Sequence, residues 1–586
     1  MIRSGFRTAL LVAAAGVALA ATVTCSQSTD LATTPTPATE VASPERDPQT
    51  LRLLYSRSAV TLNPHLATGY QDFEAARIVY EPLASYNQAG ELVPFLADEI
   101  PSAENGGIAA DGTAVTWTLR PDVTWSDGEP FTADDVVFTF EFIRNPVVAA
   151  ATAQYYEGVK SVEAIDDYTV KITFTDPTPA WSVPFTGQTG LILPRHIFAE
   201  HNGPSARDAL ANLQPVGTGP YQAVGFESGT VIYEPNPSYW GGRPAFERVE
   251  LVGGLAPYAA ARAVLQTNEA DFAHNLQVEA EALRALETDA TGHVTHLFGA
   301  QVERIMLNFA NPFARTEDGE RSSPSIPHPY FSDLRVRQAI NLAIDRDTIA
   351  KELYGSAGKP TAQLLVAPLD YQSESIAYTY DLERAKALLD EAGWVDTNGD
   401  GLREKDGVAL EVLFQAAVNP VRQKTQTIVS DSLAELGVDV QISRVRLDEF
   451  FSADPQDTQS LNHFFADMQV YSIGNENPDP TTYMGWWTCA KMASQANQWQ
   501  QPNNARYCNP EYDRLWAEAK QELDPDRRAE LFQQMNKLLA EDVAVIPVVH
   551  RAMTNAVSDR LTEVEFTPWD ASTWAIKDWQ PAPSDS

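Results

Sequence analysis

Residues with binding chemistry follow a short apolar run in the C-terminal fifth of the chain. Residues 468–473 alternate as a mostly buried strand does, and Gly474 and Pro478 prevent the strand from continuing. The loop beyond combines a carboxylate, amides and flat aromatic faces, supplied by Glu476, Asn475, Asn477, Tyr483, Trp486 and Trp487. This inventory suits the wall of a ligand pocket. The alternative is an acidic surface loop whose tryptophans pack inward, since most such loops only connect elements.

Motifs that mark enzymes are missing from the sequence. It contains no HExxH, CxxC or GxSxG motif, and residues 355–360 imitate a phosphate-binding loop without its spacing or its Ser or Thr. The nine histidines are scattered, without the helical spacing of metal ligands. Acidic pairs are too common in this chain for any of them to indicate a glycosidase. We therefore predict no catalytic residue and no cofactor.

One segment resembles the first two-thirds of a calcium-binding loop. Gly401 stands at the sixth position, where such loops turn sharply. The twelfth position is Gly407 instead of a bidentate Glu, so we expect weak or absent binding, and any calcium bound would be structural. The alternative is a turn between a helix and a strand. The candidate ligands are Asp396, Asn398, Asp400 and Glu404.

Composition places the chain among globular proteins. Its 586 residues allow about three to four domains, and 44% of them are hydrophobic. The chain has 79 acidic against 42 basic residues, a net charge of −37, which repels phosphate backbones and anionic membranes. We therefore expect no nucleic-acid partner, and we interpret the acidic surface as a contribution to solubility.

The N-terminus has the pattern of an export signal. Two arginines precede an apolar run that is too short for a comfortable membrane span, which predicts a signal peptide at residues 1–24. The residues before Cys25 resemble a bacterial lipobox, so Cys25 is a candidate for lipidation, and cleavage after Ala20 or Ala21 is the alternative. Residues 25–49 are rich in Ser, Thr, Pro and Ala, the composition of a flexible tether. We expect membrane contact through the lipid alone.

Two further cysteines, Cys489 and Cys508, lie in the exported part of the chain. Outside the cytoplasm we predict that they form a disulfide, and two buried free thiols are the alternative. The bridge would stabilise the fold by roughly 3 kcal/mol. It would also hold the chain just after Trp487.

Local signals elsewhere predict alternating helices and strands. Strands are expected at residues 410–414 and 438–442, between helices that carry an apolar face. Mixed α/β layers follow from this alternation. Helix starts are marked at Thr132, Asp333, Asp381 and Pro525, and helix ends at Gly393 and Gly437.

Five segments, taken in order, resemble one family across nearly the whole exported chain. They begin with TLNPHLATGY and include the turn GTGPY. The resemblance is to the family 5 extracellular solute-binding proteins, the peptide-, nickel- and opine-binding receptors of bacterial ABC importers. The segments are residues 61–101, 117–143, 217–221, 235–251 and 331–349.

The resemblance implies an α/β, two-lobed fold like that of periplasmic binding proteins, with an additional inserted domain. The two lobes would close on a ligand about a hinge. Transferred segment by segment, lobe I takes residues 50–92, 216–300 and 545–580, the inserted domain takes 93–215, and lobe II takes 301–544.

The resemblance also suggests how the ligand is held. Peptide receptors of this family bind the ligand's ammonium with a carboxylate, and Glu476 occupies that place. Val470 stands where some oligopeptide receptors have an arginine, so a peptide C-terminus finds no partner in this segment. Asn63 and Tyr70, in the first family segment, complete the candidate ligand-binding set.

We predict a lipid-anchored monomeric receptor that captures a peptide or another small amine-bearing solute. It would work at the outer face of the cytoplasmic membrane or in the periplasm, and deliver the solute unchanged to an ABC permease and ATPase complex. The alternative is a secreted hydrolase acting on peptides or carbohydrates.

Overall fold

The computed structural model describes residues 47–583 of the chain, which belong to one compact unit. The predicted signal peptide, Cys25 and nearly all of the tether lie outside the described residues. No helix between residues 47 and 583 is long and apolar enough to cross a membrane.

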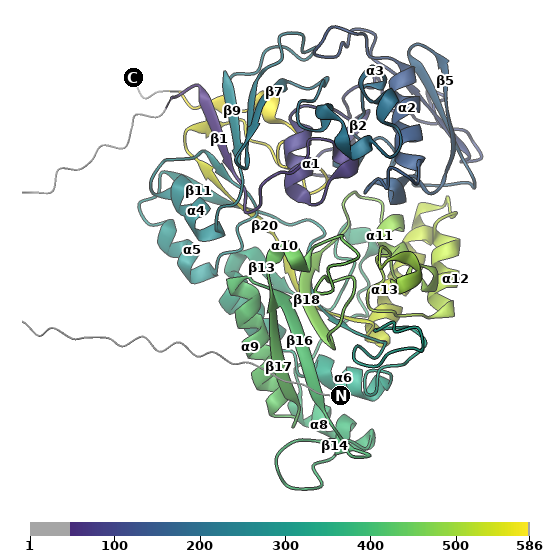
Figure 1. Cartoon of the computed structure of the whole chain (residues 1–586), viewed down its shortest axis with the longest axis vertical. Helices are drawn as coiled ribbons and strands as arrows, with labels where there is room; N and C mark the ends of the chain where they lie inside the picture. The colour runs from purple at the N-terminus through teal and green to yellow at the C-terminus, as the bar shows by residue number, and fades with distance from the viewer. Residues whose placement is uncertain (1–46, 584–586) are drawn as a thin grey trace, which may run out of the picture. The chain divides into compact units, whose positions relative to one another are not determined.

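The first large sheet has seven strands in the order β11-β20-β10-β1-β9-β8-β7 (Figure 1). Its central strand β1 (Thr50–Leu54) is parallel to both neighbours, and Leu51 and Leu53 are fully buried on one of its faces. The other strands are β7 (Tyr221–Glu227), β8 (Thr230–Pro235), β9 (Arg248–Val252), β10 (Phe272–Ala273), β11 (Gly292–Leu297) and β20 (Met553–Ser558). Helices α4 (Pro257–Leu265) and α5 (Ala280–Leu286) lie between β9 and β11 in the chain.

A small sheet of order β4-β6-β5 lies within the predicted inserted domain. Its apolar residues share one continuous core with the seven-stranded sheet. The predicted capping box is confirmed, since Thr132 N–H donates to Asp135 Oδ2 at 3.0 Å. Its elements are β4 (Ala114–Thr118), α2 (Ala133–Arg144), β5 (Val159–Asp166), β6 (Thr169–Phe174) and α3 (Arg195–Phe198). Before them in the chain come α1 (Tyr70–Arg77), β2 (Ala84–Tyr86) and β3 (Leu92–Pro94).

The second large sheet has the order β13-β19-β12-β18-β16-β17 and is covered on both faces (Figure 1). Along β12, Ile305 and Leu307 join one apolar cluster, whereas Met306 joins another. The first cluster lies under α6 (Leu334–Leu342), α8 (Leu382–Glu391) and α9 (Pro420–Ala434), and the second lies under α12 (Pro510–Ala519) and α13 (Pro525–Glu541). Buried alternation of this kind is what a sheet between two layers of helices requires. The strands are β12 (Val302–Leu307), β13 (Gly358–Pro360), β16 (Glu411–Ala417), β17 (Asp439–Val445), β18 (Met468–Ile473) and β19 (Val545–Arg551).

The helices around this sheet begin and end at the predicted signals. Asp333, Asp381 and Asp524 each accept a hydrogen bond from a first-turn N–H group. Gly393 has φ +84° just beyond α8, a backbone conformation that favours glycine. The helices are α6 (Leu334–Leu342), α7 (Arg346–Thr348), α8 (Leu382–Glu391), α9 (Pro420–Ala434), α10 (Leu447–Phe450), α11 (Thr481–Gly485), α12 (Pro510–Ala519) and α13 (Pro525–Glu541). Short ladders pair β14 (Glu404–Lys405) with β15 (Val408–Ala409), and β21 (Leu561–Thr562) with β22 (Gln580–Pro581).

The chain passes between the two large sheets at two places. The first is residues 298–301, between β11 and β12. The second is Ala552, between β19 and β20. Residues 545–551 were predicted in lobe I but form β19 of the six-stranded sheet, where they pair with β12. We therefore propose to start the last lobe I segment after Ala552 and to keep the rest of the predicted division.

His65 joins the N-terminal segment to the inserted domain and gives a pH prediction. The ring is fully buried, with Nδ1 2.8 Å from Thr152 Oγ1 and Nε2 2.9 Å from the Leu191 carbonyl oxygen. Burial lowers the pKa of His65 from 6.5 to about 4. The unfolded chain therefore binds this proton at a higher pH than the folded chain does. We expect the free energy of unfolding to fall by about 3 kcal/mol as the pH drops from about 6.5 to about 4.

Urea unfolding across this pH range measures the effect. His65→Gln should flatten the dependence, whereas His293→Gln, which changes an exposed ring, should leave it intact. Equal slopes for wild type and His65→Gln would contradict the prediction.

Candidate functional site

The loop after β18 is held in one conformation by close contacts. A Cβ at Gly474 would lie 2.1 Å from the Ala300 carbonyl oxygen, so this position requires glycine. Asn477 Oδ1 accepts from Asp479 N–H at 3.1 Å, and Asp479 forms a buried ion pair with Arg528 at 2.8 Å. These contacts fix the backbone on both sides of Glu476.

Glu476 meets a tyrosine from the inserted domain. Tyr155, on the segment before β5, donates its hydroxyl to Glu476 Oε2. Burial raises the pKa of the Glu476 carboxyl above its ordinary range, and the hydrogen bond from Tyr155 opposes this shift. Within residues 47–583, no lysine, arginine or histidine forms an ion pair with Glu476. The site therefore holds a carboxylate that lacks a positive partner in the described chain.

Tyr70 and Asn475, two other residues of the predicted set, lie beside Glu476. They line a cavity of about 30 Å³ together with Gln301, which donates to the Tyr70 hydroxyl at 3.1 Å. Asn475 is 4% exposed, and its Nδ2 has no hydrogen-bond partner among the described residues. A buried amide donor without a partner, next to a carboxylate without a positive partner, is a polar arrangement that a ligand can complete.

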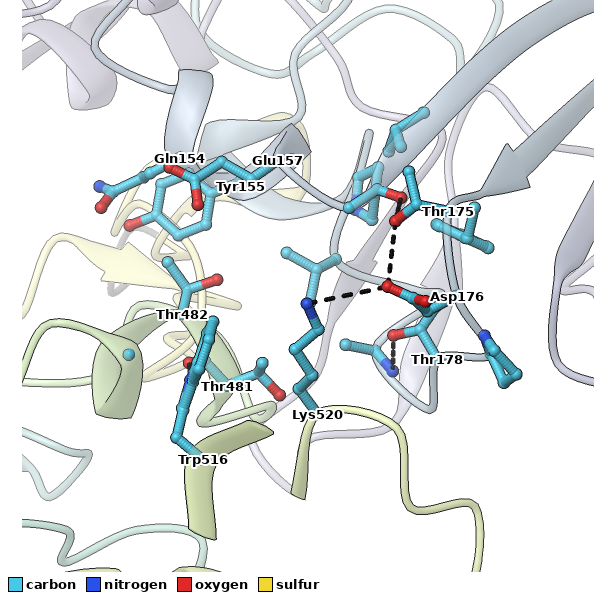
Figure 2. A pocket seen from close by; sticks show the side chains of 18 of the residues that line it. Gln154, Tyr155, Glu157, Thr175, Asp176, Thr178, Thr481, Thr482, Trp516 and Lys520 are labelled. Atoms are coloured by element: carbon cyan, nitrogen blue, oxygen red, sulfur yellow. Dashed lines mark hydrogen bonds and ion pairs between the residues drawn. The ribbon is translucent and has the colours of Figure 1, made fainter. Parts of the chain in front are cut away.

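A larger cavity, of about 220 Å³, lies on the other side of Tyr155 (Figure 2). Its walls come from the inserted domain and from α11 and α12. Trp486 lines it and donates Nε1–H to Gln154 Oε1 at 3.0 Å, a hydrogen bond between the two parts of the wall. Glu476 therefore contacts Tyr155, and Trp486 contacts the neighbouring Gln154.

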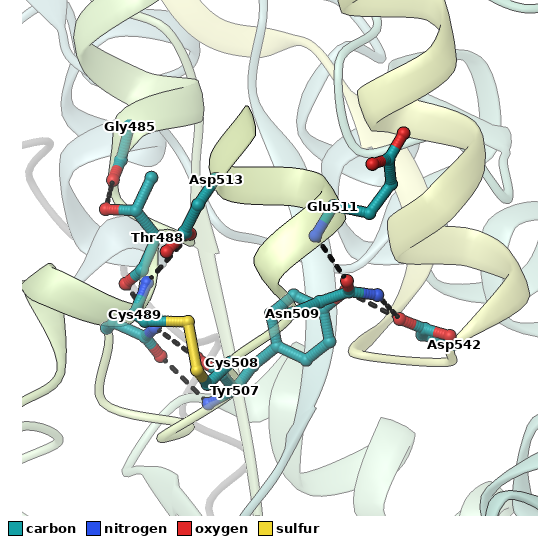
Figure 3. The surroundings of a disulfide bond; sticks show 10 residues. Gly485, Thr488, Cys489, Tyr507, Cys508, Asn509, Glu511, Asp513 and Asp542 are labelled. Atoms are coloured by element: carbon teal, nitrogen blue, oxygen red, sulfur yellow. Dashed lines mark hydrogen bonds between the residues drawn. A yellow bond between two sulfur atoms is a disulfide. The ribbon is translucent and has the colours of Figure 1, made fainter. Parts of the chain in front are cut away.

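A disulfide joins Cys489 and Cys508 below this wall (Figure 3). The Cys489 N–H donates to Asp513 Oδ1 at 3.0 Å, which ties the bridge to α12. The chain between α11 and α12 is thereby closed into a loop.

Comparison with known proteins shows which family the chain belongs to. The sequence profile of the bacterial extracellular solute-binding proteins, family 5 Middle, matches residues 91–494, more than half of the chain. The chain belongs to this family. It is a solute-binding protein of a bacterial ABC importer, as the sequence resemblance predicted.

Two relatives of the family 5 chain are named as peptide-binding proteins. The di/tripeptide-binding protein 2 of Pseudomonas aeruginosa (strain UCBPP-PA14) is 26% identical over 552 residues, covering 90% of this chain and 94% of the relative. The dipeptide-binding protein of Escherichia coli (strain K12) is 25% identical over 519 residues, covering 84% and 88%.

Solved structures share the two-lobed α/β fold. NikZ from Campylobacter jejuni, in complex with Ni(L-His), has a TM-score of 0.77 at 23% identity, covering 91% of this chain and all of that one. The oligopeptide-binding protein AppA from Bacillus subtilis, in complex with a nonapeptide, has a TM-score of 0.74 at 22% identity, covering 91% and 99%. The predicted fold class is confirmed.

Two aromatic residues of the predicted set face the core of the family 5 protein instead. Tyr483 and Trp487 are each 3% exposed. The Tyr483 hydroxyl accepts from Arg304 Nη1 at 2.6 Å, and the Trp487 ring centroid lies 5.4 Å from the Arg304 guanidinium. In this structure they enclose a buried cation on β12, and ligand contact by these two side chains stays a prediction.

The side chain of Asn63 is also engaged within the protein. It is fully buried, its Oδ1 accepts from His65 N–H, and its Nδ2 donates to Asn212 Oδ1, both at 3.1 Å. Both polar groups of the amide are engaged in this turn. Ligand contact by Asn63 stays a prediction.

The calcium-like segment is a self-contained turn. Both Asp396 carboxylate oxygens accept backbone N–H groups, from Gly399 and Gly401, and Asn398 and Asp400 bond to each other. Within the described part of the chain, no three His, Cys, Asp or Glu side chains are grouped as a metal site. The alternative reading as a turn between helix α8 and strand β14 describes this segment.

The sequence did not point to several residues that form the walls. Tyr155, Gln154 and Gln301 belong to no motif, and their neighbours in the chain carry no binding signal. Tyr155 and Gln154 contact Glu476 and Trp486 only because the inserted domain packs against the loop after β18. Gln301, just before β12, lines the same small cavity as Glu476 for the same kind of reason.

Proposed function

We propose that this family 5 protein binds a peptide or another small amine-bearing solute and delivers it unmodified to an ABC permease and ATPase complex. The carboxylate of Glu476 carries the proposal, because burial costs it hydration and no cation in the described chain compensates it. A ligand ammonium would supply the missing charge and a strong hydrogen bond. The names of the peptide-binding relatives support the same class of ligand.

Binding would replace the hydroxyl of Tyr155 on Glu476 by the ammonium. Hydrogen bonds between the parts of the chain that carry the two large sheets are available to hold the closed form. Asn419 Nδ2 donates to Gln277 Oε1 at 2.7 Å, and Arg551 Nη1 donates to Asn275 Oδ1 at 3.0 Å. A ligand that touches both sides favours closure, because it adds contacts that only the closed form has.

Mass spectrometry of small molecules that co-purify with the gently extracted protein tests this function. We expect an amine-bearing solute, recovered unmodified and in stoichiometric amount after release. Conversion of the solute by the purified protein would overturn the proposal and favour the hydrolase.

We further propose that the mature protein is a monomer anchored by a lipid on Cys25. Radiolabelled lipid precursor should appear in the protein and be absent from a Cys25→Ala variant. Label that persists in this variant would contradict the anchor.

We also predict that the Cys489–Cys508 bridge is formed in the exported protein. Removing it by a Cys489→Ser, Cys508→Ser double substitution should lower the free energy of unfolding by about 3 kcal/mol, because the unfolded chain loses a loop constraint. Urea unfolding measures this loss. Alkylation of both thiols in the wild type without reductant would contradict the prediction.

A further inference from the structure

The cavity of about 220 Å³ beside Tyr155 is too small for a whole ligand. Ligand sites in proteins usually span about 300–1000 Å³, so this cavity fits one part of a solute that extends beyond it. Tyr155 lines it with its ring while its hydroxyl contacts Glu476. Tyr155 therefore contacts both the cavity and the carboxylate of Glu476.

One side of this cavity is apolar and firmly held. Trp516, on α12, donates its Nε1–H to the Thr481 carbonyl oxygen at 3.0 Å, which fixes the plane of its indole. Phe174 and Val183, from the inserted domain, also line the cavity, as does Trp486 from the end of α11. Such a slot favours a large apolar side chain.

The other feature of the cavity is a lysine, Lys520, whose ion pair is loose. The Lys520 ammonium lies 3.9 Å from Asp176 Oδ2, at the limit of an ion pair, and makes no hydrogen bond within residues 47–583. Figure 2 shows Lys520 extending into the cavity toward Asp176. The neighbouring Lys491, by contrast, is closely paired with Glu157 at 2.5 Å. The Lys520 ammonium also lies 5.3 Å from the centroid of the Trp516 ring. Of the two lysines that line the cavity, Lys520 therefore has the looser ion pair.

We propose that this cavity binds the apolar C-terminal residue of a short peptide, whose carboxylate pairs with Lys520. The proposal rests on the proposed function, since it assumes that the peptide's ammonium lies on Glu476. An extended peptide advances about 3.3–3.6 Å per residue, and we take a peptide of about two or three residues as the ligand whose two ends reach Glu476 and Lys520. The ligand class is thus a short zwitterionic peptide that ends in a large apolar residue.

Calorimetric titration with alanyl-phenylalanine and its C-terminal amide tests the carboxylate contact. Lys520→Gln should weaken binding of the acid by about five- to ten-fold, because a charge-assisted bond in a partly exposed place is lost. Binding of the amide should change by less than two-fold. Lys386→Gln is the matched control, since the side chains of Lys386 and Lys520 are 34% and 35% exposed. Equal losses for the acid and the amide, or no loss for either, would overturn the proposal.

Filling the cavity tests the apolar part. Thr482→Trp places an indole in the space that Thr482 borders and should weaken alanyl-phenylalanine by at least ten-fold while sparing alanyl-alanine. Equal effects on both dipeptides would overturn the subsite. If wild type binds both dipeptides through Glu476 but neither variant discriminates, this inference alone fails. If wild type binds neither dipeptide nor any other amine, the proposed function fails with it.

Discussion

Glu476→Gln should weaken binding of the amine-bearing ligand by about thirty-fold to several-thousand-fold. The substitution keeps the shape of the side chain and removes the charge. Truncating one partner of a buried charged pair costs on the order of 2–5 kcal/mol, because the other charge is left without compensation. Calorimetric titration of the co-purified solute into the wild type and the variant measures this loss.

Glu163→Gln is the matched control for this titration. It changes an exposed carboxylate of the same inserted domain that supplies Tyr155. If Glu476 only shapes its turn, the Glu476→Gln substitution costs about 1 kcal/mol of stability or less and leaves affinity unchanged. An affinity change below about three-fold would remove Glu476 from the site.

The same pair predicts a pH dependence of binding. Only the ionised carboxylate attracts an ammonium, and burial raises the pKa of Glu476 above its ordinary range. Affinity should therefore be highest above this raised pKa and fall as the pH drops through it. The dependence should vanish in Glu476→Gln, which has no group to titrate at this position.

Glu303→Ala should destabilise the fold by about 3–5 kcal/mol. Glu303, on β12, binds Arg422 of α9 through two hydrogen bonds of 2.6 and 3.2 Å, and the two side chains are 1% and 4% exposed. Burial lowers the pKa of the nearby Arg551, and the charge of Glu303 opposes this shift. The substitution leaves buried guanidinium groups without their carboxylate, which is strongly unfavourable.

Urea unfolding compares this loss with that of an exposed pair. Glu518→Ala breaks a contact with Arg514 on the surface of α12 and should cost about 1 kcal/mol or less. A double substitution, Glu303→Met with Arg422→Met, should recover most of the stability, because it removes both charges together. Equal costs for Glu303→Ala and Glu518→Ala would contradict the prediction.

Local interactions made several elements predictable. Strand β18 has the predicted bounds because alternation and the following Gly474 are properties of adjacent residues. The capping box at Thr132 and the end of α8 at Gly393 likewise depend on groups within a few residues. The family segments extended these predictions to the fold class, which physical patterning alone left at mixed α/β layers.

The sequence by itself therefore determined the strand, the loop and the carboxylate at Glu476, and the tertiary structure decided what surrounds them. Tyr155 lies 321 residues away from Glu476 in the chain, so no spacing could pair them. Trp486 and Trp487 are neighbours with the same chemistry, yet one lines a cavity and the other encloses Arg304. Successive residues of a helical turn point in different directions, and only the packing of that turn determines which direction faces the ligand.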